Sequence, residues 1–326
     1  MPIDPAKTQI ATQWQYTSPL ITCRFDPQSR FVFTTAEDNT IQRWELANGA
    51  KTVFTAHDSW VFALGVTPDG TTLLSGGGDG RLAWWPVAGD KPEPIRRVDA
   101  HSGWIRQISI SGDGQFVATA GNDHRVKVWR TADGQLVREL IGHENQVYSV
   151  LFHPSGTWLL SGDLLGFVRQ GETASGAASR LFEAKDLHSY NGGQGVHFGG
   201  IRAIALSGDG KLLACGGLHK AENPLGAVHE PLAVVFDWES QKVVQSHTAD
   251  GDKGSLWRLQ HHPDGYWIGV SGGSSGGFLH FWKPDQPKEA HRFALPNLAR
   301  DLDLAPDRSG FATTHHDKHV RIGKFG

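Results

Sequence analysis

The chain has 326 residues, 39% of them hydrophobic and 20% charged, with 40 glycines, 12 tryptophans and a formal net charge of −3. It lacks the basic excess or basic stripe of nucleic-acid-binding proteins. No signal peptide is visible in its first residues, and no apolar run approaches the roughly 18 residues that a membrane span needs, so we expect neither feature. Its two cysteines, Cys23 and Cys215, form neither a metal-binding spacing nor a disulfide framework. We therefore expect a cytoplasmic protein that binds neither nucleic acid nor membranes.

One phrase recurs along the whole chain: alternating hydrophobic residues, a turn of the P/G-D-G kind, a short apolar run, and Ser/Thr-x-Gly. The turn residue falls at Pro27, Pro68, Gly112, Pro154, Gly208, Pro263 and Pro306, with spacings of 41, 44, 42, 54, 55 and 43 residues. A period just over 40 with four short strands per unit is typical of a propeller blade.

The sequence therefore predicts an all-β fold, a single domain over 1–326 that forms a seven-bladed β-propeller of four-stranded antiparallel blades. In chain order the blades are expected at about 19–56, 59–99, 103–140, 145–185, 200–247, 254–294 and 298–326, the last together with 8–16. The segment 8–16 has no other partner, and the seventh unit lacks an outer strand. We expect this segment to close the ring and so to remove an exposed sheet edge.

Four side-chain types recur in the clearest units. They are His57, Ser75, Asp79 and Trp85 in the second unit, and His101, Thr119, Asp123 and Trp129 in the third. This pattern resembles the WD-repeat family, which implies a buried hydrogen-bonded chain within each blade. A buried carboxylate needs donors, and such neighbours supply them. Because the set recurs, we interpret it as structural and not as a Ser-His-Asp catalytic triad, which would occur once.

The other units keep parts of this set. The retained members are Thr34, Asp38 and Trp44 in the first unit, His143, Ser161 and Asp163 in the fourth, Trp282 in the sixth, and Thr313 and Asp317 in the seventh. The fourth unit lacks the Trp, so we expect its polar chain to contribute less stability than that of the second.

The inner strands carry the candidate binding residues. The side chains two and four residues before the turns are mostly apolar, and another apolar column stands seven before them, out of phase with strand periodicity. This predicts a β-bulge, which re-aims its neighbours. Arginines and aromatics, the composition of binding hot spots, stand beside the proposed bulge. The predicted partner-binding residues are Trp60, Phe62, Trp104, Arg106, Tyr148, Arg202, Trp257 and Arg300.

The family resemblance implies that these residues open onto the narrower face of the propeller, around its central channel. The alternative is that Trp60 and Trp104 fill gaps between blades. Two long segments, 186–200 and 218–231, are implied to emerge on the same face. Long loops in compact domains are commonly functional.

The two long segments contain His188, His197, His219, His229, Glu222 and Glu230. Such a cluster could bind a divalent metal, but its spacing matches no established site, so we predict no metal and no cofactor.

Two motif matches are set aside. Residues 272–276 (GGSSG) fit a nucleophile elbow, but they lie between predicted strands and not at a strand-to-helix turn. Residues 76–80 (GGGDG) likewise lack a following helix to hold a phosphate.

By analogy with the family, the sequence indicates a monomeric, non-enzymatic scaffold that binds other proteins or peptides. The alternatives are a small-molecule or glycan-binding propeller, and an enzyme or metal-binding protein that uses the channel mouth.

Overall fold

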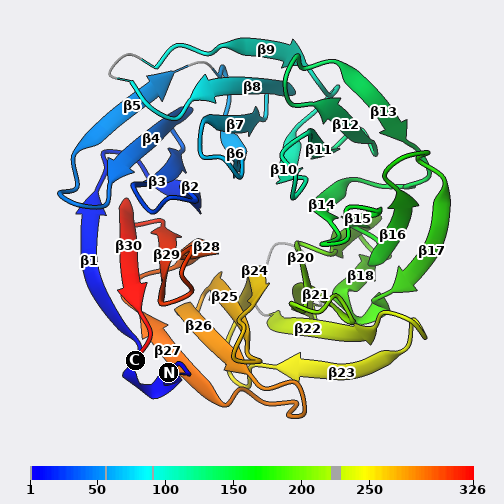
Figure 1. Ribbon diagram of the computed structural model, residues 1–326. Coiled ribbons are helices and arrows are strands. Elements are labelled where there is room, and N and C mark those ends of the chain that lie inside the picture. Colours follow the sequence, from blue (N-terminus) through cyan, green and yellow to red (C-terminus); the bar gives the residue numbers. More distant parts are fainter. Residues whose placement is uncertain (1, 56, 90–91, 222–228) are drawn as a thin grey trace.

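The computed structural model describes residues 2–55, 57–89, 92–221 and 229–326. Seven four-stranded antiparallel sheets stand in a ring around a central axis (Figure 1). The predicted all-β, seven-bladed propeller is confirmed. Within the described part of the chain, no helix has the length and apolar character needed to cross a membrane.

Each blade runs from an inner strand at the axis to an outer strand at the rim. Blade one comprises β2 (Leu20–Phe25), β3 (Phe31–Ala36), β4 (Thr40–Glu45) and β5 (Lys51–Thr55). Blade two comprises β6 (Val61–Val66), β7 (Thr72–Gly77), β8 (Arg81–Pro86) and β9 (Arg96–Asp99). Blade three comprises β10 (Ile105–Ile110), β11 (Phe116–Gly121), β12 (Val126–Arg130) and β13 (Leu136–Leu140). Blade four comprises β14 (Val147–Phe152), β15 (Trp158–Asp163), β16 (Phe167–Glu172) and β17 (Ala178–Glu183).

The second half of the ring follows the same order. Blade five comprises β20 (Ala203–Leu206), β21 (Leu212–His219), β22 (Glu230–Asp237) and β23 (Val243–Thr248). Blade six comprises β24 (Gly254–His261), β25 (Trp267–Gly273), β26 (Gly276–Trp282) and β27 (His291–Leu295). Blade seven comprises β28 (Ala299–Leu304), β29 (Gly310–His315), β30 (His319–Lys324) and β1 (Gln9–Gln15).

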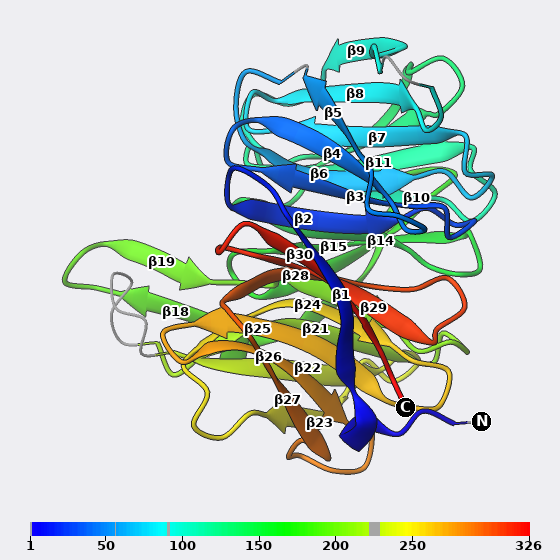
Figure 2. The ribbon, with the colours of Figure 1, turned by 90° about the vertical axis from the view of Figure 1, so that its left-hand side faces the viewer.

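Two short helical turns and one hairpin lie outside the blades. The turns are η1 (Pro5–Lys7) and η2 (Lys185–Leu187). The hairpin comprises β18 (His188–Asn191) and β19 (Val196–Gly199), between blades four and five. It projects from one face of the disk, whereas both termini lie toward the other (Figure 2).

Strand β1 closes the ring. It pairs antiparallel with β30, with Gln9 opposite Lys324 and Trp14 opposite Val320. The predicted closure by the N-terminal strand is therefore confirmed, and the two ends of the chain lie together (Figure 1). The Trp14 ring also stacks on Trp44 of blade one, with 5.9 Å between ring centroids.

The hydrophobic core is divided among the gaps between blades. The cluster between blades one and two, for example, combines Phe33 and Phe54 with Leu64, Leu73 and Trp85. The second strands are almost fully buried, because each faces a neighbouring blade on both sides. Each blade therefore completes its core only with its neighbours, as expected for a repeat architecture.

Blades two and three contain the hydrogen-bonded chains that their sequences suggest. In blade two, Trp85 Nε1 donates to Ser75 Oγ at 2.9 Å, and Ser75 Oγ lies 2.8 Å from His57 Nε2. The other ring nitrogen of His57 lies 3.1 Å from the Asp79 carboxylate. The corresponding distances in blade three are 3.0, 2.7 and 2.8 Å, for Trp129, Thr119, His101 and Asp123.

Blade one substitutes a glutamine for the missing histidine. Trp44 Nε1 donates to Thr34 Oγ1 at 2.9 Å, and Thr34 donates to Gln42 Oε1 at 2.7 Å. Gln42 Nε2 donates to Thr40 Oγ1, and Thr40 donates to Asp38, each at 2.6 Å. The chain of bonds thus still ends on the carboxylate.

Blade four also holds its carboxylate firmly. Asp163 is 1% exposed and lies 2.7 Å from His143 Nδ1. The backbone N–H groups of Leu165 and Phe167 also donate to it, each at 3.0 Å. Gly171 stands at the Trp position, where a Cβ would lie 2.7 Å from the Leu140 side chain. The missing Trp suggests that this polar chain contributes less stability than that of blade two. The contacts of Asp163 give no reason for such a difference.

Blades six and seven take their histidine from a strand. In blade six, Ser271 donates to Asp252 and lies 2.9 Å from His280 Nε2, and all three are fully buried. In blade seven, His315 Nε2 lies 2.9 Å from Thr313, and its Nδ1 donates to the Asn297 carbonyl. The segment 272–276 spans the end of β25 and the start of β26, so the GGSSG match lies at a tight turn between two strands.

Candidate functional site at the channel mouth

The predicted β-bulge is confirmed in the inner strands. In blade two, Val61 pairs with Gly77 and Ala63 with Gly76, so Phe62 is the extra residue. The same shift singles out Arg106, Tyr148, Trp257 and Arg300. In blade one the shift lies between Leu20 and Cys23. Blade five differs, because β20 begins at Ala203 and Arg202 precedes it.

The bulges bring the predicted binding residues together. All eight line one hollow of about 660 Å³ at the mouth of the channel. Trp60 is 41% and Trp104 40% exposed. The gap-filling alternative requires both side chains to be enclosed between blades, and neither of them is. Phe198 and Gly199 of β19 also line the hollow, which places it on the face from which the hairpin projects (Figure 2).

Aromatic rings and guanidinium groups alternate along one side of this hollow. The Phe62 and Trp104 rings stack with 4.9 Å between centroids, and the Arg106 guanidinium lies 4.5 Å from the Trp104 centroid. Arg106 and Arg202 lie 5.0 and 5.2 Å from the Tyr148 centroid, and Arg202 lies 4.9 Å from that of Trp257. Cation–π attraction stabilises this order. We call Phe62, Trp104, Arg106, Tyr148, Arg202 and Trp257 the aromatic–arginine arc.

The two arginines of the arc have no carboxylate partner among the residues that the structure describes. Arg106 Nε donates to the neutral Asn122 side chain at 2.7 Å. Arg202 Nε is buried without a hydrogen-bond partner in the described chain. Burial lowers the pKa of Arg106 to about 10, and the neighbouring Arg202 charge adds to the effect. Burial also lowers the pKa of Arg202. A pKa of about 10 leaves Arg106 charged at neutral pH.

The opposite side of the hollow is charge-compensated. Arg300, although it lines the hollow as predicted, donates to Glu37 at 2.6 Å. Asp301 of β28 accepts from Arg24 of β2 at 2.8 Å and from Arg258 of β24 at 2.7 Å. Among the arginines that line the hollow in the described structure, only Arg106 and Arg202 have no carboxylate partner.

The Asp301 cluster joins the first and last blades and was missed from sequence. Besides the two arginines, Asp301 accepts from the Thr22 hydroxyl and from Cys23 N. Its pKa is lowered: burial acts to raise it, but the Arg258 and Arg24 charges and the hydrogen bonds outweigh burial. The missed signal is the presence of charged residues in the inner strands, three and five positions before the turns. Arg24 stands three before its turn, and Arg258 and Asp301 stand five before theirs.

In the described parts of the histidine-rich segments 186–200 and 218–231, the side chains make separate contacts. His188 Nε2 lies 2.8 Å from His197 Nδ1 in the β18–β19 hairpin. Glu230 accepts from Lys220 and Lys253, which lower its pKa to about 2. His229 Nε2 lies 3.1 Å from Ser255 Oγ.

The described residues contain no group of three or more His, Cys, Asp or Glu side chains that could hold a metal ion. Glu222 lies outside the described residues.

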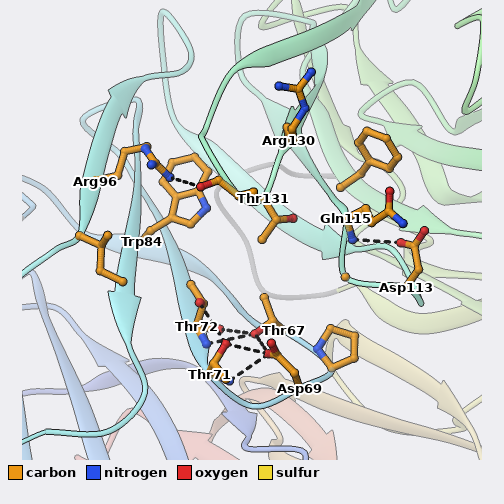
Figure 3. A pocket seen from close by; sticks show the side chains of 15 residues that line it. Thr67, Asp69, Thr71, Thr72, Trp84, Arg96, Asp113, Gln115, Arg130 and Thr131 are labelled. Atoms are coloured by element: carbon orange, nitrogen blue, oxygen red, sulfur yellow. Dashed lines mark hydrogen bonds between the residues drawn. The ribbon is translucent and has the colours of Figure 1, made fainter.

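A second hollow, of about 490 Å³, lies between blades two and three (Figure 3). It lies at the opposite end of the inner strands, because Arg106 is near the start of β10 and Asp113 follows its end. Its carboxylates are already engaged: Asp69 accepts from Thr67 and Thr71, and Asp113 accepts from Gln115 (Figure 3). Asp113 also accepts from the Ser111 hydroxyl. Both carboxylates of this hollow therefore already have hydrogen-bond donors from their own turns.

The fold and the polar chains define a WD-repeat β-propeller. The family model for the WD domain, G-beta repeat, matches residues 8–45, 50–85, 92–130 and 134–170. The chain belongs to the WD-repeat family. Comparison with curated proteins gives no match.

Proposed function

We propose that this chain is a non-enzymatic interaction platform that binds a partner protein or peptide at the channel mouth. The observation that carries this proposal is a pair of unpaired guanidinium groups held among aromatic rings in one open hollow. Trp, Tyr and Arg dominate the energetics of protein interfaces. The WD-repeat fold is commonly used for interaction scaffolds, which supports the same conclusion.

The hairpin of blade five extends the candidate surface. Tyr190 is 58% and Val196 38% exposed on this hairpin, next to the hollow that Phe198 lines. A partner peptide seated in the hollow would also contact this hairpin.

Glycan binding is less well supported by the same rings. A sugar ring needs a free aromatic face, but the Trp104 ring is already stacked by Phe62 and contacted by Arg106. We therefore assign these rings to holding the arginines and the partner.

The Ser255–His229 contact resembles a nucleophile and base in distance. However, Ser255 is only 3% exposed, and the adjacent Gly254 N donates to the His229 carbonyl at 3.0 Å. We interpret both contacts as anchoring residue 229 to β24. Labelling of Ser255 by a fluorophosphonate probe would instead favour an enzyme.

Substitution of the exposed ring and its neighbouring charge tests the proposed site. Against a partner recovered by pull-down, Trp104→Ala and Arg106→Gln should each weaken binding well beyond tenfold, since hot-spot truncations cost about 2 kcal/mol or more. Isothermal titration calorimetry measures the affinity, and thermal unfolding shows whether the fold is kept.

The matched control is Arg130→Gln, an exposed arginine on the opposite face, paired with Asp133. It should leave the affinity unchanged. Loss of binding in this control with retention in Trp104→Ala and Arg106→Gln would place the site on the wrong face.

A further inference from the structure

The positive charge of the aromatic–arginine arc indicates the charge of the group that it binds. Arg106 and Arg202 both lie against the Tyr148 ring, at 5.0 and 5.2 Å from its centroid. A buried charge is costly unless it is paired. The rings stabilise these cations, but they do not neutralise them.

The nearby carboxylates are committed to other arginines. Asp301 is shared by Arg24 and Arg258, and Glu37 pairs with Arg300. The arc therefore retains two positive charges for which the described residues offer no counter-charge. Partial burial of both side chains increases the gain from a bound anion, because the interaction is weakly screened by solvent.

We propose that the channel mouth selects acidic peptides, with an anionic side-chain group of the partner seated between Arg106 and Arg202. Guanidinium groups suit this role because their planar donors bind carboxylate or phosphate oxygens bidentately. Apolar residues flanking that group would pack on the exposed parts of Trp60 and Trp104, which are 41% and 40% exposed. This inference rests on the proposed function and names the chemistry of its partner.

Selection from a phage-displayed library of random peptides on the full chain tests the inference. We expect recovered peptides to share Asp or Glu at one position, flanked by apolar residues. In fluorescence anisotropy with a labelled synthetic copy, changing that residue to Gln or Asn should weaken binding more than tenfold. The double variant Arg106→Gln/Arg202→Gln should do the same, and the two changes combined should cost little more than either alone.

Two further variants sharpen the result. Arg106→Lys/Arg202→Lys keeps the charge but loses the planar fork, so it should bind with intermediate affinity. Thermal unfolding of the Gln variant should show that its loss of binding is not a loss of fold. Arg130→Gln should bind like the unmodified protein. A phosphoserine at the acidic position of the peptide tests the oxyanion source: tighter binding than Glu favours a phosphorylated partner, and weaker binding favours a carboxylate.

The outcomes separate the two proposals. Recovered peptides without a shared acidic residue, bound equally by the Arg106→Gln/Arg202→Gln variant but lost in Trp104→Ala, would overturn the acidic preference and the predicted effect of Arg106→Gln. They would leave the location of the binding site at the channel mouth in place. Two results would count against both proposals. One is peptides that still bind both the Arg106→Gln/Arg202→Gln variant and the Trp104→Ala variant. The other is a selection that recovers no more peptide than an unrelated immobilised protein does.

Discussion

Deletion of residues 1–16 is expected to lower the free energy of unfolding by about 3–6 kcal/mol. Each large side chain that loses its burial costs about 1.5–3 kcal/mol, and the deletion removes both Trp14 and Tyr16. Tyr16 is 9% exposed, and the Trp14 ring stacks on Trp44. The deletion also exposes β30 as an unpaired edge, so the truncated chain should aggregate. Chemical denaturation and light scattering measure the two effects.

Deletion of residues 1–7 is the matched control, because it removes η1 but leaves β1 paired with β30. It should lose less stability than the 1–16 deletion, because it removes only the packing of Ile3 and Pro5 against the core of blades six and seven. A 1–16 deletion that stays monodisperse and unfolds like the 1–7 deletion would show that β1 does not close the ring energetically.

Asp301→Asn is expected to destabilise the protein by roughly 3–5 kcal/mol, the typical loss when one partner of a buried ion pair is removed. The change leaves Arg24 and Arg258 without their shared carboxylate, at the junction of blades six, seven and one. The exposed Asp58→Asn, which breaks only the surface pair with Arg81, is the control. Denaturant titration should show almost no change for this control.

The effect of Asp301 should depend on pH in a defined direction. Its folded-state pKa is lowered, so between the folded and unfolded pKa values the unfolded chain binds more protons. The stabilisation is therefore fully present above the unfolded pKa of about 4 and is lost as pH falls toward the folded value. Asp301→Asn should flatten the acid limb of stability. Equal acid dependence in the variant and the unmodified protein would contradict this role.

The elements predictable from sequence are those set by local spacing. The spacing of the turn residues predicted the seven blades. The apolar column seven residues before the turns, which includes Val61 and Ile105, predicted the bulge. These signals are local because strand alternation and turn chemistry act over a few residues.

What sequence reasoning missed depends on pairing between strands. Gln42, His280 and His315 lie on strands and not in the loop where His57 lies, so only the sheet register shows that they reach their hydroxyl partners. The Asp301 cluster joins residues far apart in the chain. For the same reason, sequence could not show that Arg300 is paired while Arg106 and Arg202 are not.

Hydroxyl-radical footprinting of the chain, alone and with a bound partner, tests the central claim most directly. The claim is that partners bind over the aromatic–arginine arc. It predicts that Trp60, Trp104 and Tyr148 become protected on binding, while Pro68 and Phe116, which line the opposite hollow, keep their reactivity. Unchanged oxidation of Trp60 and Trp104 in the complex, with protection of Pro68 and Phe116, would contradict it.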